Sequence, residues 1–138
     1  MTVADLYAEA VAVSRAAVMY EAQRDLEETV AFIESVAAEQ NKLSAEIIAK
    51  LESVVIPAAA GGFSSVEILE FKGGDQFEEY SLLFLLLGGH DQERRRQLEA
   101  LGFEPLIGRL SEALRPFELH HVWDRETNWN RLILKWNK

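Results

Sequence analysis

Six consecutive apolar residues, Leu82–Leu87, constrain the fold of this chain more than any other part of its sequence. Side chains on a strand alternate between the two faces of a sheet, so a wholly apolar strand must be covered on both faces. The run is far shorter than the roughly 20 residues of a membrane-spanning helix. We therefore expect a central strand with helices on one face. The N-terminal helices, or a second copy of the protein, would cover the other face.

The first 40 residues have the periodicity of an amphipathic helix. Thr2 and Asp5 have the spacing of a capping box. Apolar residues follow at alternating steps of three and four, namely Val3, Leu6, Ala10, Val13, Ala17 and Tyr20. The stripe breaks at Arg24 and resumes in a rotated position with Leu26, Val30, Ile33 and Ala37. Residues 3–40 therefore form either two helices or one long helix with a shifted stripe.

The polar segment QNKLS, residues 40–44, predicts a turn. Ser44 can cap a further helix, whose apolar residues are Ile47, Ile48, Leu51, Val54 and Val55. Pro57 and the glycines at 61 and 62 are expected to end this helix, because proline breaks helices and glycine terminates them.

The rest of the chain predicts two β-hairpins with two helices between them. The strand-like segments are residues 64–71, 78–87, 117–124 and 129–136, and the first two are joined by a turn at 72–76. Asp91 can cap a helix that ends at Gly102, and Pro105 can begin a second helix that Pro116 closes. The expected fold is a single α+β domain over 1–138, with a helical part (1–60) and a ββααββ part (63–138). Its sheet would have four mostly antiparallel strands.

Charge and composition exclude several classes of function. The formal net charge of −9 argues against a protein that holds nucleic acid through its phosphates. The chain has no cysteine, so disulfides and Cys-ligated metal centres are excluded. The first residues lack the features of a secretory signal, which favours a cytoplasmic protein. Residues 1–60 carry ten acids and four bases, so they form either a solvated acidic surface or a surface for a basic partner. In the second case the acidic helices could mimic nucleic acid and block that partner.

No pattern in the sequence indicates catalysis, a metal or a cofactor. His120 and His121 are adjacent on a predicted strand and point to opposite faces, so they cannot bind one ion together. His120 and Asp124 would share a face but lie on the order of 13 Å apart. None of the serines lies in a nucleophile motif. We expect His121 to be a hydrogen-bonded core residue and His120 to be a surface residue.

The turn Gly88–Asp91 is one candidate ligand site. Glycines that precede a helix N-terminus can present backbone N–H groups to an anion, and Arg94 would add positive charge. His90, Asp91 and Arg94 would then be the working groups of a ligand-binding protein or an enzyme. The alternative is a tight turn in which Asp91 caps the following helix and leaves no room for an anion.

The C-terminal hairpin is the other candidate. A four-residue loop would place five residues on one face, namely His120, Val122, Trp129, Arg131 and Ile133. In this register His120 pairs with Ile133, and Val122 pairs with Arg131. An aromatic anchor with some aliphatic surface and matched charges is typical of a protein interface. The opposite face would be core, with Leu119, Trp123, Leu132, Leu134 and Trp136. Alternatively, the N-terminal helices bury the Trp129 face within the same molecule.

These observations favour a small acidic, cytoplasmic binding protein that acts by protein–protein contact, without catalysis and as a homodimer. Chaperones, immunity proteins and inhibitors share this size and charge. The partner-binding residues would be Trp129, Ile133, Arg131, His120 and Val122. The alternative is a ligand-binding protein or an enzyme with its pocket at Gly88–Asp91. No cofactor, metal, direct nucleic-acid contact or membrane contact is expected.

Overall fold

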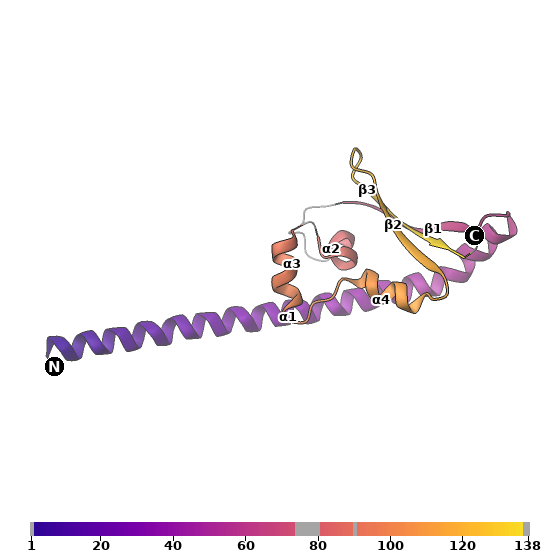
Figure 1. Ribbon diagram of the computed structural model, residues 1–138. Helices are drawn as coiled ribbons and strands as arrows, with labels where there is room; N and C mark the ends of the chain where they lie inside the picture. The colour runs from indigo at the N-terminus through magenta and orange to yellow at the C-terminus, as the bar shows by residue number, and fades with distance from the viewer. Residues whose placement is uncertain (1, 74–80, 90, 137–138) are drawn as a thin grey trace. The chain divides into compact units, whose positions relative to one another are not determined.

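The computed structural model describes residues 2–73, 81–89 and 91–136 and has an α+β architecture (Figure 1). Its elements in chain order are α1 (Val3–Ala60), β1 (Ser65–Lys72), α2 (Leu82–Leu87), α3 (Gln92–Glu99), α4 (Leu106–Ala113), β2 (Glu118–Trp123) and β3 (Trp129–Lys135). The chain forms two compact units, Met1–Glu34 and Ser35–Lys138. The first unit consists of the N-terminal part of α1. The second unit holds the rest of α1 and all the other elements.

α1 is a single helix of 58 residues, which decides between the two alternatives for residues 3–40. The predicted capping box is present at its start. The Asp5 N–H donates to Thr2 Oγ1, and the Thr2 N–H donates to Asp5 Oδ2, both at 3.1 Å. Pro57 lies inside α1 and does not end it. Proline disturbs the turn before it, but its own carbonyl still accepts, here from the Gly61 N–H at 3.1 Å.

The turn predicted at residues 40–44 is wrong, because these residues lie inside α1. Gln40 is a buried helical residue of the second unit. Its side chain is 2% exposed. Nε2 donates to the carbonyl of Leu85 at 2.9 Å and to that of Glu104 at 2.7 Å, and Oε1 accepts from Arg109 Nη2 at 2.9 Å. These buried carbonyls need donors, so the tertiary fold keeps the segment helical where its polarity predicted a turn.

The apolar run Leu82–Leu87 is the helix α2, and the central strand predicted for it is wrong. Ser81 caps it, since Ser81 Oγ accepts from the Phe84 N–H at 3.1 Å. Gly88 ends it with φ 85°, and its N–H donates to the Phe84 carbonyl at 2.9 Å. A short helix buried on every side needs the same composition as a strand covered on both faces. The predicted turn at 72–76 and the start of the predicted strand lie mostly outside the described residues.

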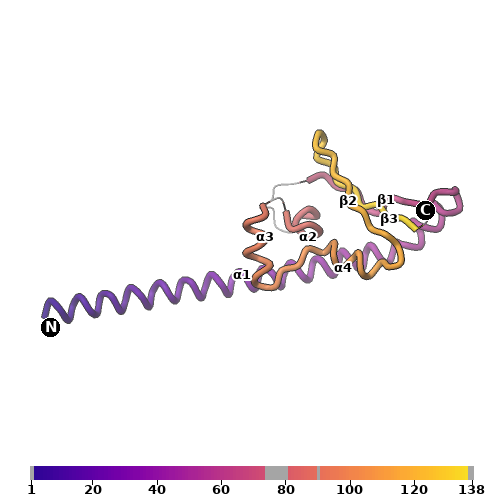
Figure 2. The backbone as a smooth tube through the Cα atoms, viewed as in Figure 1, coloured from indigo at the N-terminus to yellow at the C-terminus, as the bar shows by residue number. Residues whose placement is uncertain are grey.

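The described sheet has three antiparallel strands in the order β1-β3-β2, so the expected fourth strand is absent from it. Figure 2 traces the backbone through these strands. β1 was expected to pair with residues 78–87. Leu82–Leu87 form α2 instead, and β1 pairs with β3. A bulge in β1 lies between Glu67 and Leu69. It turns both Ile68 and Leu69 toward the core, where a regular strand would send one of them outward.

Helices cover one face of the sheet. Leu132 and Leu134 of β3 are fully buried there, in clusters that include Ile47 and Val55 of α1. The clusters also contain residues of α2, α4 and the turn after α4, namely Leu83, Leu86, Leu106, Leu110 and Leu114. The helices predicted after residue 91 are confirmed as α3 and α4. Within the described ranges, no helix is both long and apolar enough to span a membrane.

Candidate functional site

The C-terminal hairpin has the predicted register. His120 pairs with Ile133, and Val122 pairs with Arg131. The Asp124 N–H donates to the Trp129 carbonyl at 2.9 Å, which closes the four-residue loop. Side-chain alternation therefore puts the five predicted partner-binding residues on one face of the sheet, opposite the face that packs on the helices.

β1 extends this face beyond the hairpin. Glu67 lies beside Ile133, Glu70 beside Arg131, and Lys72 beside Trp129. We use the term outer face for the residues of the three strands that point away from the core, namely Ser65, Glu67, Glu70, Lys72, Glu118, His120, Val122, Trp129, Arg131, Ile133 and Lys135. The contribution of β1 was not foreseen, because this strand was expected to pair with residues 78–87.

The outer face is open to solvent in the structure. Trp129 is 41% exposed and Val122 is 39% exposed, while Ile133 is half-buried beside His120 and Glu67. Within the second unit, α1 packs on the opposite face of the sheet through Ile47 and Val55 and does not bury Trp129. An exposed tryptophan on a face that also carries two aliphatic residues is the kind of group that supplies most of the energy in a protein interface.

The charges on the outer face balance. Three acids and three bases lie on it, namely Glu67, Glu70, Glu118, Lys72, Arg131 and Lys135. Two contacts connect neighbours: Arg131 Nε lies 3.9 Å from Glu67 Oε1, and His120 Nε2 lies 3.3 Å from Glu118 Oε2. Both contacts are solvent-exposed, so they add little stability and leave the charged groups able to change partners.

The opposite face agrees with the predicted core except at Trp123, which is 44% exposed. His121 is hydrogen-bonded, as expected, with Nε2 at 2.8 Å from Asn130 Oδ1. Since an amide oxygen only accepts, Nε2 carries the proton. Asn130 is 1% exposed, and its amide donates to the Asn128 carbonyl at 3.3 Å.

Asn128 organises the loop end of the hairpin, a role that sequence reasoning missed. It has φ 59°, a left-handed conformation that asparagine tolerates better than most residues. Its Oδ1 accepts from Trp123 Nε1 at 3.0 Å, and its Nδ2 donates to the Gly73 carbonyl at 2.9 Å. In the sequence, the only feature that pointed to this role was an asparagine at the last position of the loop. At the other end of the loop, the backbone N–H of Glu126 and the side chain of Thr127 lower the pKa of Asp124.

Asp91 and Arg95 hydrogen-bond to backbone groups on either side of the predicted Gly88–Asp91 site. Asp91 Oδ1 accepts from the N–H groups of Glu93 and Arg94, at 3.1 and 3.2 Å, so the carboxylate occupies the place an anion would take. Arg95 Nη1 donates to the Leu87 carbonyl at 2.9 Å. Arg94 is half-buried. His90 lies outside the described residues. Asp91 therefore caps α3, as the alternative to a ligand site predicted.

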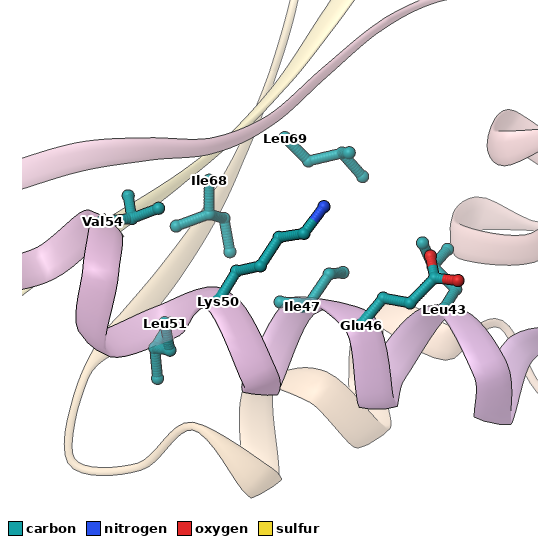
Figure 3. A pocket seen from close by; sticks show the side chains of 8 residues that line it. All are labelled: Leu43, Glu46, Ile47, Lys50, Leu51, Val54, Ile68 and Leu69. Carbon is teal, nitrogen blue, oxygen red and sulfur yellow. The ribbon is translucent and has the colours of Figure 1, made fainter.

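A groove lies between α1 and β1, at the margin of the core (Figure 3). It is lined mainly by aliphatic side chains, namely Leu43, Ile47, Leu51, Val54, Ile68 and Leu69. Glu46 and Lys50 complete the lining, and the Lys50 ammonium points into the space between helix and strand (Figure 3). Such a groove suits an apolar group. No sequence-predicted site residue lines it.

Within the ranges 2–73, 81–89 and 91–136, no group of three or more His, Cys, Asp or Glu side chains could hold a metal ion. No protein-family model, curated protein or solved structure matches the chain.

Proposed function

We propose that this protein is a cytoplasmic binding module without catalytic activity, which acts by protein–protein contact as a homodimer. Two copies would meet through their outer faces, with Trp129, Ile133 and Val122 as the apolar contacts. Arg131, which separates Trp129 from Ile133 on β3, and His120 would lie among them. The working principle would be that of small chaperones, immunity proteins and inhibitors, which stabilise or occlude a partner.

One observation carries this proposal: the outer face combines exposed apolar residues with balanced charge on a strongly acidic chain. Two copies that each carry a net charge of −9 repel each other over most of their surface. On the outer face the three acids and three bases cancel. A twofold axis brings each patch against its own copy, so an acid of one copy can meet a base of the other. Trp129 would supply the anchor.

The test is the mass of the protein in solution. The double variant Trp129→Ala with Ile133→Asp should convert a dimer to a monomer in sedimentation equilibrium, because it removes the anchor and buries a charge in the interface. A matched control changes one aromatic and one isoleucine that are exposed elsewhere, Phe63→Ala with Ile48→Asp. The control should remain dimeric. A monomeric wild type, or equal masses for the two variants, would refute the proposal.

A further inference from the structure

The N-terminal unit carries an exposed apolar stripe. The N-terminal stripe consists of Val3, Leu6, Ala10, Val13, Ala17 and Tyr20. All six residues are exposed, and the four larger ones are between 57% and 86% exposed. The helix of this unit therefore gains no stability by burying these side chains, although most helical stability in proteins comes from such packing. An exposed apolar stripe of this kind indicates a docking surface.

The spacing of the stripe identifies the shape of its occupant. Alternating steps of three and four place the six residues at the a and d positions of successive heptads. An a/d seam is narrow, and the surface that fits it is another helix with the same repeat. The seam ends near Arg24, which lies on its line but forms an i,i+4 contact with Glu28 at 3.8 Å.

The charges beside the seam identify the chemistry of the occupant. The positions that flank an a/d seam set partner choice through charge pairing. Here they hold Glu9 and Glu21 together with uncharged residues, and no lysine or arginine. Arg15 lies on the opposite side of the helix. Residues 1–34 carry seven acids and two bases, net −5, so two copies of this unit would bring together acids that no flanking base can neutralise.

We propose that the N-terminal stripe binds a helix of another protein, with an apolar a/d stripe flanked by lysine or arginine. The inference rests on the proposed function, since it names the partner class of the binding module. It assigns the two surfaces by charge. The outer face is neutral and joins two copies of the chain, whereas the N-terminal stripe is acidic and takes a basic partner.

The test uses the full-length protein and synthetic peptides of about three heptads with leucine at a and d. One peptide has lysine at the flanking positions, its twin has glutamate there, and a third has the composition of the lysine peptide in scrambled order. Fluorescence anisotropy at about 0.15 M salt measures each affinity. The affinity of the lysine peptide should be at least about tenfold higher than that of either other peptide.

Two variants separate the stripe from general acidity without changing any charge. Leu6→Gln with Val13→Gln should weaken binding of the lysine peptide by about tenfold or more. Ala8→Gln with Met19→Gln alters exposed residues on the opposite side of the same helix and should change it by less than about twofold. Circular dichroism checks that both remain helical. The outer-face variant Trp129→Ala with Ile133→Asp should bind the peptide normally, so loss of dimerisation and loss of peptide binding are distinguishable.

Three results would overturn the inference. Equal binding of the lysine and scrambled peptides would show attraction to acidity alone. Unchanged affinity in the Leu6 and Val13 variant would show that the seam is not the contact. A fall in the mass of the protein in that same variant would show that a second copy occupies the stripe.

Discussion

Replacing Gln40 by methionine should destabilise the second unit more than its size suggests. Methionine has nearly the same length and helix propensity as glutamine, so the change removes hydrogen bonds and little else. The buried Leu85 carbonyl would lose its donor, at a cost of about 1–3 kcal/mol. The partly buried bonds to Glu104 and from Arg109 would cost about 0.5–1.5 kcal/mol each, because water can replace part of them. We expect a total loss of about 2–6 kcal/mol.

Urea unfolding followed by tryptophan fluorescence measures this loss, since all three tryptophans lie between Ser35 and Lys138. At a typical slope of about 2 kcal/mol/M, the expected loss lowers the midpoint by about 1–3 M urea. Gln23→Met is the matched control: it makes the same change in the same helix, where Gln23 is exposed and donates only to Glu27 at 3.2 Å. The control should lose less than about 0.5 kcal/mol. Equal midpoints for the two variants would refute the assigned role of Gln40.

Two further predictions concern the glycine at the end of α2 and the hairpin loop. Gly88→Ala should destabilise more than Gly62→Ala in the same urea assay: the two glycines have φ 85° and 87°, but only at Gly88 would a Cβ lie 2.6 Å from Arg95 Cδ. Equal losses would show that backbone conformation alone matters. The lowered pKa of Asp124 means that the loop is stabilised above the carboxyl group's ordinary value of 3.8 and loses this support as pH falls through the lower folded value. In an NMR titration the Asp124 carboxyl and the Glu126 amide should share a midpoint below that of Asp124 in the urea-unfolded chain; a coincident or higher midpoint would contradict the described loop.

Much of the local structure could be predicted, because it depends on residues close together in the chain. The capping box at Thr2 and the N-cap at Asp91 need only neighbours within three positions. The hairpin register follows from the alternation of its two strands and the length of its loop, so His120 faces Ile133 as expected. The five predicted contact residues therefore share one exposed face. Whether they bind a partner is for the proposed experiments to decide.

The structure of Leu82–Leu87 could not be predicted from the sequence. Leu82–Leu87 specifies burial on all sides, and both a central strand and a short buried helix provide it. The tertiary structure chooses the helix, with Ser81 and Gly88 as its caps. That choice removes the expected partner of β1 and leaves β1 to pair with β3, which extends the outer face by Glu67 and Glu70.

The sequence by itself determined where α1 begins, that its apolar residues form stripes, and how the hairpin pairs. Only the tertiary structure decided which parts of α1 are buried. Ile47 and Val55 lie in the core, while Leu6 and Val13, with equally apolar side chains, stay exposed. Periodicity shows which side of a helix is apolar, because that depends on the helix alone. Burial depends on what lies opposite, and distant parts of the chain or another molecule supply it.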